Sequence, residues 1–115
     1  MALWKFNKRT FEMGFPRGDT PRIKINVDVP TGVVPTITFT MRKEATKQSP
    51  ILVTKALDLE DGEYYLQFEE ADTRDLDYGK YYYDVEYREP NSTPIRTQTL
   101  ILSTIELTKE VTVHD

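Results

Sequence analysis

The sequence contains no cysteine and one histidine, His114, in 115 residues. Without cysteine there are no disulfide bonds, thiolate metal ligands or cysteine nucleophiles, which fits a reducing compartment. The histidine lies beside Asp115 at the end of the sequence, where we expect an exposed side chain rather than a ligand. These shortages argue against an enzyme, and the sequence predicts no catalytic residue, no metal ligand and no cofactor site.

Long apolar runs are also missing. Met1–Thr10 holds no run long enough for a signal peptide, and no later stretch is long enough to span a bilayer. With 38% hydrophobic and 30% charged residues, the composition predicts one small soluble domain over residues 1–115. A chain of this length buries a core without disulfides. We therefore expect no membrane partner.

Charge is divided unevenly along the chain. Residues 1–57 carry ten Lys/Arg against four Asp/Glu, a net +6, and residues 58–115 carry five against fifteen, a net −10. We expect the halves to interleave and neutralise each other across neighbouring strands. The alternative is a bipolar particle that stacks head to tail on a partner or as a homo-oligomer. Nucleic acid is disfavoured as a partner, because the net charge is −4 and basic residues form only pairs such as Lys8-Arg9.

The dominant hydrophobic period is two. In Arg22–Val29, apolar residues alternate with polar ones over all eight positions, which is typical of a half-buried strand. Thr36–Arg42 repeats the pattern with threonines on the wet face, where their β-branch suits the pleat. Lys80–Arg88 is the strongest strand, and it places four residues on one face: Tyr81, Tyr83, Val85 and Tyr87.

Further strands and turns follow from the same pattern. The additional strands are expected at Leu3–Phe11, Ile51–Leu57, Glu63–Glu69, Ile95–Leu102 and Ser103–Val113, the last with a bulge or kink at Lys109-Glu110. Asp61-Gly62 predicts a hairpin turn, and Pro30–Gly32, Glu44–Pro50 and Glu89–Pro94 predict connections. Glu70–Tyr78 is interpreted as a loop with one helical turn, capped by Asp72, with Leu76 in the core.

Short strands, frequent turns and no amphipathic helix indicate an all-β fold. The pattern favours a β-sandwich of seven to eight strands, with immunoglobulin-like topology as the leading interpretation. The missing cysteines exclude the inter-sheet disulfide of antibody domains. We find no internal repeat and no linker, so one domain is expected.

Arg17-Gly18-Asp19 is a tripeptide that some adhesion receptors bind. Three residues are a weak match, and the tripeptide directly precedes a strong strand. A turn is the better interpretation, with Gly18 at positive φ and Asp19 accepting hydrogen bonds from the amides that follow it.

The seven tyrosines and Trp4 provide rings on which a sugar could stack. Tyr81, Tyr83 and Tyr87 alternate on one face and are expected in the core. Tyr65 and Tyr82 fall on the polar faces of their strands and are the candidates for exposed rings.

The segment Asp58–Asp77 holds nine carboxylates and one cation, Arg74. Clustered oxygens suit calcium, but no spacing here matches a 12-residue calcium loop. We expect a solvated rim that protects edge strands. A small hydrolase with a carboxylate pair is a third, weaker hypothesis, because no nucleophile or base accompanies such a pair.

Three stretches together carry a resemblance. They are Arg17–Thr20 leading into the alternating strand, Asp72-Thr73 through Leu76 and Gly79 to Tyr83-Asp84-Val85, and Thr99-Leu100 through Ile105 and Leu107 to Val111-Thr112. In this order they resemble the small immunoglobulin-like domains of phage tails and baseplates, including the N-terminal domain of upper baseplate proteins of Gram-positive phages. The sequence departs from that family at Leu102–Thr104, where members commonly have a glycine after the Thr-Leu pair, and it is shorter than a full upper baseplate protein.

The resemblance implies a non-enzymatic structural module of a phage or prophage virion, assembled in the host cytoplasm through contacts with other tail or baseplate proteins. A carbohydrate-binding or cell-surface adhesion module with the same sandwich fold is the alternative.

Overall fold

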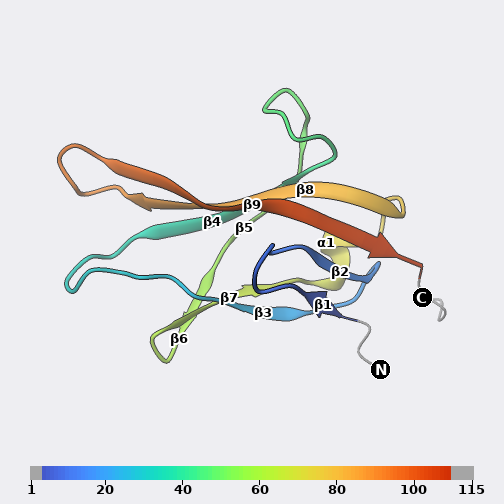
Figure 1. Cartoon of the computed structure of the whole chain (residues 1–115), viewed down its shortest axis with the longest axis horizontal. Coiled ribbons are helices and arrows are strands. Elements are labelled where there is room, and N and C mark those ends of the chain that lie inside the picture. The colour runs from blue at the N-terminus through green and yellow to red at the C-terminus, as the bar shows by residue number, and fades with distance from the viewer. Residues whose placement is uncertain (1–3, 110–115) are drawn as a thin grey trace.

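The computed structural model describes residues 4–109, which form two β-sheets facing each other with one short helix between strands (Figure 1). The strands are β1 (Lys5–Phe6), β2 (Met13–Pro16), β3 (Arg22–Ile25), β4 (Thr36–Arg42), β5 (Ile51–Ala56), β6 (Asp58–Glu60), β7 (Glu63–Gln67), β8 (Gly79–Glu89) and β9 (Arg96–Thr108), and the helix is α1 (Glu70–Thr73). The predicted all-β class is confirmed.

The larger sheet has six strands in the order β1-β2-β9-β8-β4-β5, and the smaller has three in the order β3-β7-β6. Neighbouring strands run antiparallel except for β2 and β9, which run parallel from Met13 opposite Ile105 to Pro16 opposite Thr108. β2, near the start of the described chain, and β9, its last strand, therefore lie side by side in one sheet.

The core lies between the sheets and is built by the predicted alternation. Ile37, Phe39 and Met41 of β4 are buried, as are the inward residues of β8, which are Tyr81, Tyr83, Val85 and Tyr87. Phe68, just after β7, brings the two sheets together, because its ring centroid lies 4.8 Å from that of Phe15 in β2 and 5.4 Å from that of Phe39. The inward assignment of the three strand tyrosines is confirmed.

The strand expected over Arg22–Val29 is shorter in the structure. β3 ends at Ile25, which faces Tyr64 in β7. Beyond that point β7 has only Glu63, its first residue, before the Asp61-Gly62 turn. The hydrogen-bonded ladder between β3 and β7 stops there because β7 offers no further strand residues beyond Glu63 for pairing. Val27 and Val29 still pack against the core.

The two strands expected over Ile95–Leu102 and Ser103–Val113 are one strand, β9, within the described residues. The register shifts between Val85, which faces Ile101, and Glu86, which faces Thr99. Leu100 is the extra residue of this bulge, and the strand continues through it. Glu110–Val113, and with them half of the bulge expected at Lys109-Glu110, lie outside the described residues.

The N-terminal strand expected over Leu3–Phe11 was too long. Leu3 lies outside the described residues, and within residues 4–11 only Lys5–Phe6 pairs with another strand. The chain then turns at residues 7–11, where Phe11 has a φ of 62°. β2, the strand that follows this turn, was not predicted from the sequence.

The acidic connection contains the expected helical turn, α1. The Asp72 carboxylate accepts a hydrogen bond from the Glu69 amide at 2.7 Å and an ion pair from Lys55 of β5 at 2.6 Å. Asp72 therefore takes part in capping the helix as the N3 residue of a capping box, but the N-cap itself is Glu69 and not Asp72 as expected. Leu76 is half-buried against the core as expected. No helix in the described part of the chain has the length and apolar character needed to cross a bilayer.

Opposite charges from the two halves of the chain meet on the smaller sheet. Arg22 of β3 pairs with Asp58 at 3.4 Å and with Glu60 at 2.6 Å, and Lys24 pairs with Glu63 at 2.8 Å. The expected neutralisation across neighbouring strands is confirmed at Lys24 and Glu63 of β3 and β7, whereas Arg22 reaches across β7 to the acidic residues of β6.

Candidate functional site

The Arg17-Gly18-Asp19 tripeptide forms the expected turn. Gly18 has a φ of 84°, and the Asp19 amide donates to the Pro16 carbonyl at 3.1 Å. The Arg17 guanidinium donates to the Leu76 carbonyl at 3.0 Å and lies 4.3 Å from the centre of the Tyr78 ring. Within residues 4–109, Asp19 accepts its side-chain hydrogen bond from the indole of Trp4 at 2.8 Å, not from the amides that follow it as expected. Both charged side chains therefore have partners within the fold.

Thr73, which the sequence analysis named only as part of the resemblance, completes this turn. Its side chain is fully buried, and its hydroxyl accepts the Gly18 amide at 2.8 Å. A buried amide without a partner would cost free energy, so this threonine holds the turn onto α1.

The acidic segment is dispersed by the fold. No group of three or more acidic or histidine side chains in residues 4–109 is placed to hold a metal ion. Asp58, Glu60 and Glu63 are ion-paired on the smaller sheet instead. His114 lies outside the described residues.

The outward face of the larger sheet carries a regular array of polar side chains. Two cross-strand rows form its centre: Arg42–Tyr82–Thr104 and Thr40–Asp84–Leu102, each taken from β4 through β8 to β9. Thr38 and Glu86 face each other in the next row. Leu102 is 74% exposed at the centre of this face.

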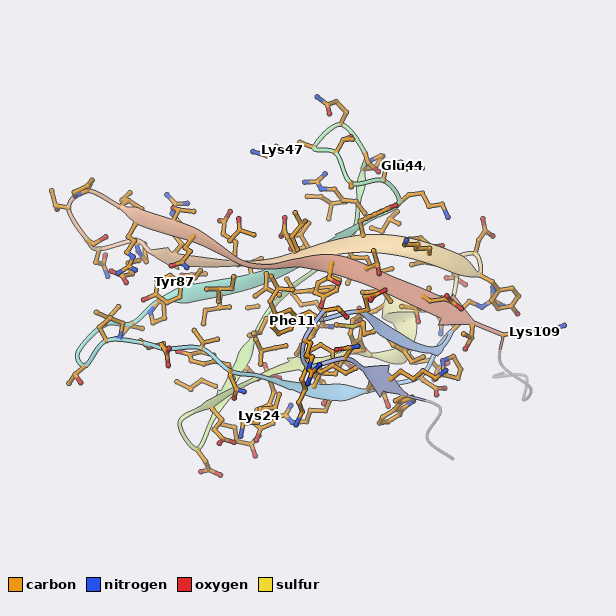
Figure 2. The ribbon with its side chains drawn as sticks, viewed as in Figure 1. Phe11, Lys24, Glu44, Lys47, Tyr87 and Lys109 are labelled. Carbon is orange, nitrogen blue, oxygen red and sulfur yellow. The ribbon has the colours of Figure 1, made fainter. Side chains whose placement is uncertain are left out.

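The connection between β4 and β5 stands out from this face, on the side opposite Lys24 (Figure 2). It is held by its own hydrogen bonds. The Arg42 guanidinium donates to the Ser49 carbonyl at 2.5 Å, and the Ser49 hydroxyl accepts the Glu44 amide at 3.2 Å. These hydrogen bonds hold the connection in place beside the sheet.

The outward face of the larger sheet and the β4–β5 connection together line a hollow of about 380 Å³, which we call the Tyr82 cleft. Its principal side chains are Thr40, Arg42, Lys47, Tyr82, Asp84 and Leu102. Burial raises the pKa of the Asp84 carboxyl, and the neighbouring Glu86 charge raises it further, while Arg42 and Lys47 act in the opposite direction. Neither Asp84 nor Glu86 has an ion-pair partner in the described part of the chain.

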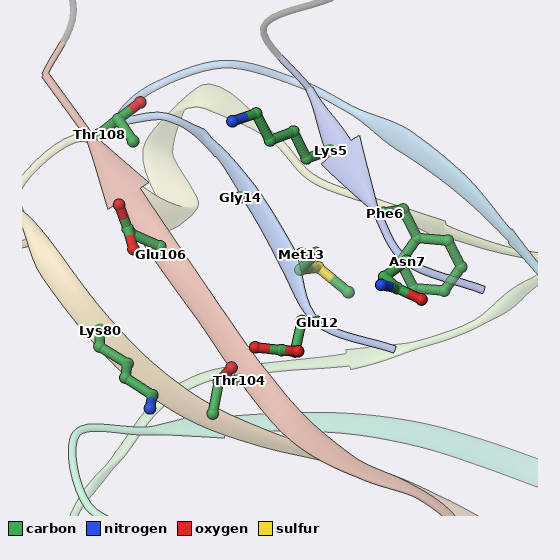
Figure 3. A pocket seen from close by; sticks show the side chains of 10 residues that line it. All are labelled: Lys5, Phe6, Asn7, Glu12, Met13, Gly14, Lys80, Thr104, Glu106 and Thr108. Carbon is green, nitrogen blue, oxygen red and sulfur yellow. The ribbon is translucent and has the colours of Figure 1, made fainter. Parts of the chain in front are cut away.

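A second, larger hollow of about 630 Å³ lies on the same face between β1, β2, β9 and β8 (Figure 3). It opens above Gly14, where a side chain is absent and where a Cβ would stand 3.4 Å from the Glu106 carbonyl. Lys5 and Lys80 line it together with Glu12 and Glu106. Its one aromatic ring, Phe6, is half-buried and faces Phe11 at 6.1 Å.

The two rings expected to be exposed are half-buried and lie on different sheets. Tyr82 lines the Tyr82 cleft. Tyr65 lies on the smaller sheet under the Arg22 guanidinium, 4.2 Å from its ring centre, and donates to Glu63 at 3.0 Å. The structure does not bring them together. Sequence alternation placed Thr40, Asp84 and Arg42 on outward faces, but it held no signal for the rows that join them.

No protein-family model matches the sequence, and no curated protein matches it either. Hydroxyls, carboxylates and cations line the hollows, and the described residues that line them include no thiol or imidazole.

Proposed function

We propose that the chain is an immunoglobulin-like module that works through protein–protein contacts in the tail or baseplate of a phage or prophage particle. The strand order supports the fold: β3-β7-β6 corresponds to strands B, E and D of an immunoglobulin sandwich, and β9-β8-β4 to G, F and C. β5 then takes the place of the additional strand of variable-type domains. β2 lies beside β9, so the N-terminal strands β1 and β2 belong to the sheet of the last strand.

The observation that carries the proposal is that the three stretches of the phage-like resemblance contact one another. Arg17 and Gly18 of the first stretch bind Leu76 and Thr73 of the second. In the ladder between the second and third stretches, Tyr81 faces Ile105. Residues that define a resemblance along the chain therefore form one connected structural unit, as a shared fold requires.

Contacts would use the outward face of the larger sheet and its free edge. β5 is the edge strand, and Ile51 and Leu52 there are 53% and 37% exposed. Exposed apolar residues on an unpaired edge are typical of strands that pair with another chain. The partners in this proposal are other tail or baseplate proteins or further copies of the chain, joined in the host cytoplasm and retained in the virion.

The test is the composition of the particle. Particles released from the cells that encode the chain would be purified on a density gradient, analysed by mass spectrometry and labelled with an antibody for electron microscopy. Particles from cells in which the gene is deleted are the control. We expect the chain in the particle fraction and the label on the tail. Complete tails that lack the chain, with the chain found free in the lysate, would overturn the proposal.

A further inference from the structure

We propose that the Tyr82 cleft binds a neutral saccharide. This is a ligand site in addition to the assembly role, and it does not depend on that role. The argument uses the charge balance of the cleft, its hydrogen-bonding groups and its apolar surfaces.

The cleft holds charges of both signs. Asp84 and Glu86 lie on the sheet, in β8, and Glu44 lies on the β4–β5 connection. Arg42 and Lys47 supply two positive charges. A strongly anionic or cationic ligand would meet a like charge wherever it lay. A neutral ligand that both donates and accepts hydrogen bonds uses all of these groups, which is the chemistry of a polyol.

Among the charged groups of the cleft, Asp84 gives the strongest argument for a ligand that donates hydrogen bonds. Its carboxylate is half-buried on the sheet and has no ion-pair partner in residues 4–109. A carboxylate accepts hydrogen bonds and, when ionised, donates none, so its partners must be donors. Sugar hydroxyls donate to a carboxylate in a charge-assisted hydrogen bond, and they accept from the Lys47 ammonium across the cleft.

The apolar part of the cleft suits the other side of a sugar ring. Tyr82 supplies an aromatic ring, and Leu102 exposes 74% of its surface in the adjacent row. A ring of this kind buries large area with few torsions to order, and it packs on the C–H face of a pyranose. The volume of about 380 Å³ lies within the range of small-molecule sites.

The second hollow has a similar balance of positive and negative side chains, but its aromatic ring is placed differently. Phe6 there is packed against Phe11 instead of standing open. The Tyr82 ring is also half-buried, and the Lys80 ammonium lies 5.7 Å from its centre, but within the described residues it is not packed against a second ring. The Tyr82 cleft is therefore the hollow whose aromatic ring is better placed to meet a ligand.

The test begins with the intact chain on an array of neutral and charged glycans. The strongest neutral hit would then be titrated into ¹⁵N-labelled protein. We expect amide shifts confined to the cleft, in residues 38–47, 82–86 and 102. Tyr82→Ala should weaken binding by about tenfold or more, as loss of one stacked ring implies. Tyr65→Ala is the matched control, because it removes a half-buried tyrosine from the other sheet, and it should leave binding unchanged.

Leu102→Arg gives a second variant that does not depend on the tolerance of Tyr82. The position is exposed, so the fold is retained, and the longer cationic side chain should block the cleft and abolish the amide shifts. Three outcomes would overturn the proposal: no glycan on the array binds, the shifts fall outside the cleft, or the Tyr65 and Tyr82 variants lose binding equally. A peptide that shifts these amides when no glycan does would also overturn it.

Discussion

Tyr83 joins the core to the N-terminal turn, and its substitution tests both roles. The side chain is 2% exposed, its ring centre lies 5.5 Å from that of Phe39, and its hydroxyl donates to the Phe11 carbonyl. Tyr83→Ala removes the ring and the hydrogen bond together. Large-to-small substitutions of buried aromatic residues lower the free energy of unfolding by about 3–5 kcal/mol, and we expect a loss in this range.

Tyr83→Phe separates the two contributions. The ring stays, but the Phe11 carbonyl loses its donor, and leaving such a group unpaired costs about 1–3 kcal/mol. At this chain length, each kcal/mol corresponds to a fall of roughly 4 °C in the melting temperature. The phenylalanine variant should therefore melt between the wild type and the alanine variant.

The assay is urea denaturation followed by far-UV circular dichroism, with thermal melts of the same samples. Tyr82→Phe is the matched control, because Tyr82 is the neighbouring residue on the opposite face of the strand and no hydrogen bond of its hydroxyl is present in the described structure. A Tyr83→Ala variant that melts within a degree or two of the wild type would refute the inward assignment. If Tyr83→Phe and wild type unfold at the same urea concentration, the hydrogen bond to Phe11 contributes nothing.

Three further predictions concern the turn, the acidic helix and pH. Thr73→Val should lower the free energy of unfolding by about 1–3 kcal/mol, because the Gly18 amide loses its buried acceptor. Thr73→Ser keeps the hydroxyl and should retain most of the wild-type stability. Urea denaturation of both variants tests this prediction. Asp72→Ala removes the acceptor of the Glu69 amide in the capping box of α1 and leaves the partly buried Lys55 without its carboxylate, so a loss of about 1–2 kcal/mol is expected. A variant as stable as wild type would show that neither contact matters. Burial raises the pKa of Tyr81 and of Tyr83 above the usual 10.0, so stability from these groups is complete below pH 10 and falls as pH rises past that value, where the unfolded chain releases protons first. Tyr83→Phe should show a shallower fall in melts between pH 9 and pH 11, and an unchanged slope would count against the buried hydroxyl.

Much of the fold could be predicted because side chains alternate along a strand, so the face to which a residue points depends only on whether its position is odd or even. Tyr81, Tyr83 and Tyr87 were assigned to the core on that ground, and the hairpin at Asp61-Gly62 followed from its turn residues. These are local properties of the sequence. Where the sequence-based prediction failed, the deciding contact was distant along the chain.

β2 shows the limit most clearly. Its four residues, Met13–Pro16, include a glycine and a proline and have the composition of a turn, yet they form a strand because β9 lies alongside. β3 ends early for the opposite reason, since its partner β7 begins only at Glu63. The Tyr82 cleft depends on the same kind of information, because cross-strand register brings Asp84 beside Leu102.

The parallel alignment of β2 with β9 determines how the fold would respond to tension along the chain. Pulling on the two ends first peels β1 from β2, because the load reaches that antiparallel pair one rung at a time. The load then enters β2 at Met13 and β9 at Thr108, which are opposite ends of their four paired positions. Those four pairs are loaded in shear and must break together, so the β2–β9 pair would act as a mechanical clamp on everything folded between residues 16 and 105.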